Sequence, residues 1–453
     1  MEAEETTAAG STFTNVTFAT AFAATPVVVV LTTNQGGDPS ILRIRNVTSA
    51  GFEVAAVEPP GNDGPHAAIT FHYVAMTPGI HALPSGEIVV AGTHTTSTVQ
   101  RSPGVGGPSG LDTVNFGVTL GTTANVVASL QTMNSESGAV PTSPSMPWLS
   151  VVMQDRTSSS VSVALERSEV DEGTVQPETI GYIAFPDASS GSFDDDSGAT
   201  ISWSAMTTPN NIVGFNNNCV ANTFSSTAFA AARVVAGKVT RNGGDGGWLR
   251  RCSLTATRIG LQVDEDISND GERNHIAETA SLLAFSGSFH ATINVALNAM
   301  LNAVKTVEII EDPVNGLTDP YAIPAGRARY SIDIESSGKL PADTNTVSFV
   351  DPIPTETSLV INDISGPGSG PILFSDGTPA SNLTYTFSSL ASTTDDIDFS
   401  NDNGVTFSYT PTPNTDRTDP AVTHIRVRPQ GSFAVNASGT APNFRLQFDT
   451  IID

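Results

Sequence analysis

The chain carries one long sequence pattern three times. Each copy opens on a Phe that is followed ten positions later by a Val: Phe18 and Val28, Phe116 and Val126, Phe224 and Val234. A Leu behind a large apolar residue comes next (Leu42, Leu149, Leu249), then an alternating run that ends on an acid (Glu58, Glu166, Asp264). An apolar stretch closes each copy (ITFHYVAM, ETIGYIAF, ETASLLAF). A long internal repeat constrains the fold strongly, because every copy is expected to take the same structure.

Copies spaced by about 100 residues suit small β-sandwiches, and short alternating runs between turn residues are typical of antiparallel strands. After Lys305 the chain changes to Asp-Pro and Gly-Pro turns between runs such as RYSIDIE and HIRVRP. We therefore predict an all-β chain of tandem antiparallel β-sandwiches. Its expected parts are a flexible tail at 1–12, three units at 13–110, 111–205 and 206–304, and a C-terminal domain at 305–453.

The chain has 453 residues, of which 46 are acidic and 20 are basic, for a formal net charge of −26. That charge repels a phosphate backbone, so we expect no nucleic-acid partner. No apolar run reaches the ~20 residues of a membrane-spanning helix, so we expect no membrane insertion. The opening MEAEETTAAG has neither the basic nor the apolar segment of a signal peptide.

Cys219 and Cys252 both lie in the third copy. A redox or metal site is the functional interpretation, but the spacing is not that of a CxxC motif. A disulfide bond is the structural interpretation. We favour it because the composition resembles that of exported proteins.

The segments TFATAFAATPVVVVLTT, NVTSAGFEVAAVE and FHYVAM of the first copy together resemble the H-type lectin domain. The second and third copies resemble it more loosely. The resemblance implies a small antiparallel sandwich that assembles as a trimer and binds sugars, often N-acetylgalactosamine. In that family the closing strand usually carries Trp-x-Ala; here it reads Tyr73-Val74-Ala75, Tyr182-Ile183-Ala184 and Leu282-Leu283-Ala284. We hypothesise that three linked copies form such a trimer within one chain.

The C-terminal part resembles a repeat that is common in large bacterial cell-surface proteins. The matching pieces are Pro324-Ala325-Gly326, Tyr330-Ser331-Ile332, Gly338 and Asp351-Pro352-Ile353-Pro354. The resemblance implies an immunoglobulin-like domain that acts as a spacer or stalk.

Candidate ligand-binding residues lie on loops and closing strands: Asp63, His66, Tyr73, Glu178, Tyr182, Asp245 and Trp248. The loop from Arg241 to Trp248 is the strongest single candidate, because a Trp beside Gly and Asp can stack on a sugar and hydrogen-bond it. The competing interpretation places Trp248 in the core, since Trp148 and Ile41 hold equivalent positions.

The acidic loop of the third copy suggests Ca²⁺, with Asp264, Asp266 and Asp270 as candidate ligands, because Ca²⁺ prefers oxygen ligands. The EF-hand order fails, however, since Gly271 comes too late. Solvated carboxylates, or a salt bridge to Arg273 or Arg167, are the alternatives. We expect no other cofactor.

The motifs GxSxG, Walker A and HExxH are absent, and no carboxylate pair is fixed as in a glycosidase. We expect a non-enzymatic extracellular or cell-surface protein that serves adhesion or glycan binding, with glycans or cell-surface components as partners. The alternative is a structural subunit of an extracellular filament or coat. Such a homo-oligomer would assemble through residues 1–12 and the final FRLQFDTIID segment.

Overall fold

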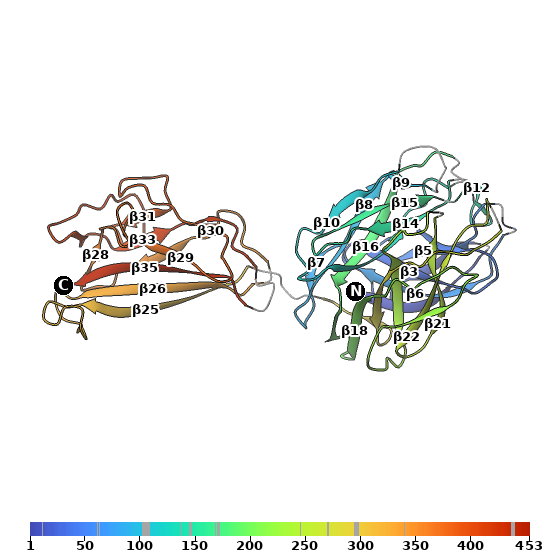
Figure 1. Ribbon diagram of the computed structural model, residues 1–453, viewed down its shortest axis with the longest axis horizontal. Helices are drawn as coiled ribbons and strands as arrows, with labels where there is room; N and C mark the ends of the chain where they lie inside the picture. Colours follow the sequence, from blue (N-terminus) through green and yellow to red (C-terminus); the bar gives the residue numbers. More distant parts are fainter. Residues whose placement is uncertain are drawn as a thin grey trace. The chain divides into compact units, whose positions relative to one another are not determined.

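The computed structural model describes residues 1–453 apart from 11, 61, 63, 102–108, 137, 145–146, 168, 170–172, 245, 270, 294–298, 339 and 436–439. The described residues form β-strands joined by turns, with no helix among them, which confirms the all-β prediction. Accordingly, the described part of the chain holds no helix long and apolar enough to cross a membrane. Contacts divide the chain into two compact units, Met1–Ala296 and Leu297–Asp453, and Figure 1 labels strands of both.

Three sets of four strands in the first unit share one strand order. In that order the sets are β3 (Val27–Thr33), β6 (Ile69–Met76), β1 (Glu2–Ala8), β24 (Phe289–His290); β11 (Ala124–Leu130), β16 (Glu178–Pro186), β8 (Ile88–Thr96), β7 (Gly79–Ala82); and β20 (Arg233–Lys238), β23 (Ala280–Phe285), β18 (Thr200–Thr207), β17 (Ser189–Asp194). The fourth strand of each set comes from the end of another copy: β7 pairs with β8, β17 with β18, and β24 with β1. The end of the third copy thus completes the sheet of the first, which closes the copies into a circle.

Each four-strand set is accompanied by three strands, again in one order. They are β2 (Thr14–Thr17), β5 (Gly51–Val57), β4 (Ile41–Arg45); β10 (Asp112–Asn115), β15 (Ser160–Arg167), β14 (Leu149–Gln154); and β19 (Val220–Thr223), β22 (Arg258–Asp264), β21 (Trp248–Leu254). Phe18, Phe116 and Phe224 directly follow β2, β10 and β19. Their N–H groups donate to the carbonyl just before the next strand of the set, at 2.9–3.0 Å (Ala50, Ser159, Thr257). The three Phe residues therefore hold equivalent places.

Smaller strands complete the first unit. β9 (Val99–Gln100) adds to β15 in parallel, and β12 (Gly138–Ala139) pairs with β13 (Ser143–Pro144). A parallel pairing of β21 with β3 joins the third copy to the first directly, with Arg250 opposite Thr32.

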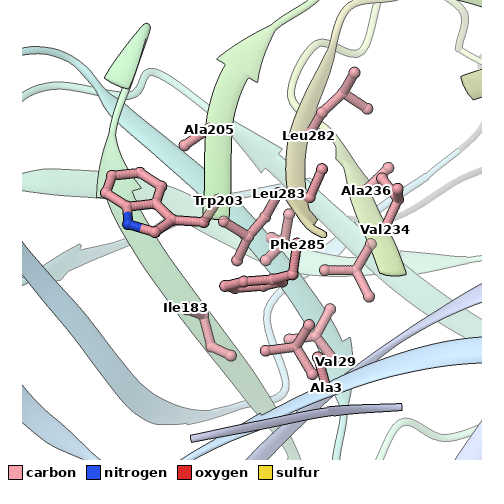
Figure 2. Packing of buried hydrophobic residues seen from close by; sticks show 14 of the residues in the cluster. Ala3, Val29, Ile183, Trp203, Ala205, Val234, Ala236, Leu282, Leu283 and Phe285 are labelled. Atoms are coloured by element: carbon pink, nitrogen blue, oxygen red, sulfur yellow. The ribbon is translucent and has the colours of Figure 1, made fainter. Parts of the chain in front are cut away.

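The largest hydrophobic core of the first unit takes residues from all three copies. Ala3 and Val29 come from the first copy, Ile183 from the second, and Trp203 and Phe285 from the third. Figure 2 shows these side chains gathered around Phe285. Separate cores fill the sandwiches of the first and second copies. Because the copies share a core, they are expected to unfold together rather than as three independent domains.

The second unit is a separate layered β structure with its own core. One sheet follows the order β25 (Leu301–Glu311), β26 (Arg327–Ser336), β35 (Asn443–Ile452), β28 (Thr357–Val360), β32 (Thr418–Asp419), with β29 (Leu373–Asp376) also on β35; smaller sheets hold β27 (Phe349–Pro352), β33 (His424–Val427), β31 (Ile397–Ser400), and β30 (Leu383–Thr384), β34 (Gln430–Gly431). Phe444, Leu446 and Phe448 of β35 alternate into the core. Since successive side chains of a strand point to opposite faces, β35 buries one face in this core.

Two sequence expectations are wrong. Residues 1–12 are not a flexible tail, because Glu2–Ala8 forms β1 between β6 and β24. The unit boundaries at 110 and 205 are misplaced, since β8 and β18 belong to the sheets of the copies that follow them. The physical reason is the exchange of strands between copies. A connector can complete a neighbouring sheet only by becoming a strand itself. The boundary at 304 is misplaced too, because the second unit begins at Leu297 and its strand β25 at Leu301.

Cys219 and Cys252 form a disulfide bond with a Cα–Cα distance of 5.9 Å, as expected from the sequence. It joins the chain just before β19 to β21 across a separation of 33 residues.

Replacing both cysteines by Ser is expected to lower the free energy of unfolding of the first unit by about 3–4 kcal/mol, because the open chain regains conformational entropy. Denaturant unfolding of the variant and the parent measures this difference. The transition of the second unit serves as the internal control and is expected to stay unchanged. Equal midpoints for the first unit in both proteins would contradict the prediction.

Candidate functional site at the junctions between copies

β11 and β20 are edge strands of their sheets, and on the same side β3 is paired with β21 only at Thr32 and Thr33. Backbone N–H groups nearer the start of each of these strands are therefore left without a strand partner. At the repeated Val of each copy, a side chain from another copy accepts that N–H. Val28 donates to Gln131 Oε1 at 3.0 Å, Val126 to Ser281 Oγ at 3.2 Å, and Val234 to His72 Nδ1 at 3.0 Å. Each copy is therefore joined to the other two at one equivalent backbone position.

The three acceptors do not all occupy equivalent sequence positions in their copies. His72, Gly181 and Ser281 are equivalent, since each precedes the central residue of its closing strand. Gly181 has no side chain to offer, and a Cβ atom there would lie 2.6 Å from Cδ of Gln131. Gln131 fills that space, and its Nε2 also donates to Val28 O at 2.8 Å. The absence of a side chain at position 181 therefore leaves the space in which Gln131 accepts the hydrogen bond from Val28.

Gly181→Ala is expected to destabilise the first unit by about 1–3 kcal/mol, because the added methyl displaces Gln131 and leaves the N–H of Val28 unsatisfied. The matched control is Gly287→Ala, where an added Cβ meets no atom within 4 Å. Thermal unfolding of both variants measures the effect. Equal transition temperatures for the two would refute this role for Gly181.

His72 is buried against charged groups of three strands. Its Nε2 lies 2.9 Å from Glu5 Oε2, its Nδ1 lies 3.0 Å from Arg251 Nη1, and Arg233 adds positive charge nearby. Burial, followed by the charge of Arg251, lowers the pKa of His72 to about 4. The neutral imidazole suits the junction, because Nδ1 can then accept from Val234 while Nε2 donates to Glu5.

The lowered pKa makes stability depend on pH. Between about pH 6.5 and about pH 4 the unfolded chain binds a proton at His72 and the folded chain does not, so stability falls as pH falls through this window. His72 alone is expected to contribute about 3 kcal/mol to this loss. His72→Gln, which cannot titrate, is expected to flatten the pH dependence of the unfolding temperature. The same slope in both proteins would contradict this assignment.

Buried ion pairs also connect the copies. Arg43 of the first copy pairs with Glu136 of the second, and Arg241 of the third pairs with Glu166 of the second at 2.8 Å. Arg250 of the third copy pairs with Asp264 at 2.7 Å and donates to the carbonyl of Thr33 in the first. Since buried charges require partners, these pairs help to fix how the copies are placed.

Glu178 and Glu278 are equivalent acids that fold the loop after β11 and β20. Glu178 is fully buried and accepts from Thr132 Oγ1 at 2.5 Å and from two backbone N–H groups, of Asn134 and Ser135, at 2.7 and 2.6 Å. Glu278 makes the same set of contacts to Thr240, Asn242 and Gly243. Glu178, which the sequence predicted as a ligand residue, therefore has a structural role in holding this loop.

Glu178→Ala is expected to destabilise the first unit by about 2–4 kcal/mol, because two backbone donors and a hydroxyl lose their acceptor. The control is Glu53→Ala, which removes the partly exposed ion pair with Arg45 and is expected to change stability by less than about 1 kcal/mol. Denaturant unfolding compares the two. A smaller loss for Glu178 than for Glu53 would argue against this role.

The three aromatic candidates are buried as well. The hydroxyl of Tyr73 donates to Glu2 Oε1 at 2.5 Å. Tyr182 lies 5.8 Å from the ring centroid of Phe116, and burial raises its pKa. Trp248 is 7% exposed, stands edge-on to Trp148 at 4.7 Å, and donates to Ser40 O at 2.9 Å. Of the two interpretations of Trp248, the core interpretation agrees with the structure.

The remaining ligand candidates lie on loops. Asp63 and Asp245 fall outside the described residues. His66 is buried, with Nδ1 2.8 Å from Ala67 O, and burial lowers its pKa. A polar cleft of about 100 Å³ lies between the first and second copies, lined by Glu58, Pro59, Pro60, Asn62, Gly64, Thr142 and Ser143.

The proposed Ca²⁺ ligands are engaged with protein groups. Asp264 accepts from Arg250 and Arg273, and Asp266 accepts from the N–H groups of Glu169 at 2.9 Å and Ser268 at 3.0 Å. Asp270 lies outside the described residues. Within the part of the chain that the structure describes, no group of three or more His, Cys, Asp or Glu could hold a metal ion. Ca²⁺ binding stays a prediction.

No protein-family model matches this chain, and no curated protein is significantly similar to it.

Proposed function

We propose that the first unit is a non-enzymatic carbohydrate-binding module of an extracellular or cell-surface protein. The observation that supports this proposal best is the polar cleft between the first and second copies. Its lining includes the carboxylate of Glu58, the amide of Asn62, and the hydroxyls of Thr142 and Ser143. None of the described residues that line the cleft is cationic. Carboxylate, amide and hydroxyl groups suit a neutral polyhydroxyl ligand better than a phosphate.

Hydrogen bonds between residues that line the cleft add support. The N–H of Gly64 donates to Glu58 Oε2 at 2.9 Å, and Asn62 Nδ2 donates to Pro59 O at 3.0 Å. Groups that are positioned before a ligand arrives lose less conformational freedom when it binds, which favours affinity.

A glycan array followed by calorimetry tests the proposal. The intact chain is expected to bind neutral glycans, and Asn62→Ala is expected to weaken binding at least tenfold through loss of an amide contact. The matched control is Asn302→Ala on the second unit, which is expected to bind as the parent does. Absence of glycan binding, or equal binding by both variants, would reject the proposal.

The alternative function is that of a structural subunit. One observation favours it, but with an edge strand of the second unit as the assembly surface in place of the terminal segments. The terminal segments already have partners within the chain. β35 is paired on both sides, whereas β1 is paired with β6 along its length and with β24 at Glu2 and Ala3. Among the described strands of the second unit, β25 is an edge, with Val304 60% and Val307 56% exposed. Long exposed edge strands with apolar side chains are templates for pairing with another chain.

Negative-stain electron microscopy of the intact protein tests this alternative. Ordered polymers that disappear in Val307→Lys, a charge placed on the edge strand, would support a structural role. The matched control is Val314→Lys, which places the same charge on the exposed turn that follows β25 and is expected to leave the polymers intact. Particles of single-chain size at all concentrations would reject the alternative.

A further inference from the structure

A cavity of about 70 Å³ lies where the three copies meet. Equivalent stretches of all three copies line it: residues 30–32 of β3, 128–130 of β11 and 236–238 of β20, together with residues of β4, β14 and β21. One water molecule requires about 10–15 Å³, so the cavity has room for more than one.

Two cationic side chains line this cavity with donors that the described protein does not satisfy. Lys238 is 4% exposed and Arg43 is 1% exposed. Among the described residues, neither Lys238 Nζ nor Arg43 Nε has a hydrogen-bond partner. A buried ammonium without a partner is costly, and a guanidinium cannot relieve the cost by losing its proton.

The acids near these cations have other partners. Glu136 Oε1 pairs with Arg43 Nη1 and also accepts from the N–H of Leu149 at 2.9 Å. Glu278 accepts from Thr240, Asn242, Gly243 and His275 with its two oxygens. Glu265 is hydrogen-bonded to the other ring nitrogen of His275. None of these contacts reaches Lys238. Glu136 Oε2 also has no hydrogen-bond partner among the described residues. The unsatisfied N–H groups of Lys238 Nζ and Arg43 Nε nevertheless outnumber this one carboxylate oxygen, which favours a negatively charged occupant.

We propose that this cavity binds a small inorganic anion of about the size of chloride, held by the ammonium of Lys238 and the guanidinium of Arg43. The anion sits among the three copies and stabilises their junction. Position 238 distinguishes the copies here, because its equivalents are Thr32 in the first and Leu130 in the second. The site is therefore single rather than threefold.

Crystals of the intact chain soaked in bromide test the location directly. An anomalous peak in the cavity, within hydrogen-bond distance of Lys238 Nζ, is the expected result. Electron density for water alone, with no anomalous peak, would overturn the proposal.

Thermal unfolding tests the role in solution. Sodium chloride is expected to raise the transition temperature of the first unit by about 2 °C or more relative to sodium gluconate of the same concentration, because only the folded state binds the anion. Lys238→Met is expected to lose this difference, whereas Lys305→Met on the second unit keeps it. Should Lys238→Met fail to fold, the bromide soak and the parent protein decide the question. A bromide peak without any chloride dependence in the parent would mean binding at crystal concentration only, and would also overturn the proposal.

Discussion

The backbone N–H groups of β3, β11 and β20 that have no strand partner are the constraint on which the first unit depends. A sheet edge in a protein interior has backbone N–H groups that must be satisfied, because an unpaired buried donor costs about 1–3 kcal/mol. Here each copy supplies the acceptor for another copy, through Gln131, Ser281 and His72. A copy taken alone would expose this edge to water. The fold of one copy therefore depends on its association with the other two.

Strand exchange addresses the same problem at the opposite edge of each sheet. β7, β17 and β24 each complete the four-strand set of another copy, and β24 reaches from the end of the third copy to β1. Several charged residues singled out in the sequence are also internal. Asp264 and Glu166 pair with arginines, and Glu178 holds a loop by its backbone. The acids of this strongly negative chain are thus partly buried. Lys238 places an ammonium group that has no hydrogen-bond partner among the described residues in the cavity where the copies meet.

The repeat could be recognised from sequence because its buried positions recur. Phe18, Phe116 and Phe224 hold equivalent places, and Val28, Val126 and Val234 lie at three equivalent junctions between copies. The acceptors at these junctions could not be predicted, since a His, a Gln and a Ser accept the equivalent hydrogen bonds and do not all occupy equivalent positions. The acidic sequence EAEETTA predicts a tail, yet it forms β1, where Tyr73 and the N–H of Ala19 satisfy Glu2 inside the protein. For β18, the alternation of Ile201, Trp203 and Ala205 was an available signal of a half-buried strand.

The most direct test of this account is native-state hydrogen exchange at the amides of Val28, Val126 and Val234. If side chains of neighbouring copies accept these N–H groups in a shared interior, all three amides exchange only when the whole first unit unfolds, and their protection equals that of the central strands. Rapid exchange at these three amides, with slow exchange in β6, β16 and β23, would show three separate sandwiches with open edges. That result would contradict the closed arrangement of the copies.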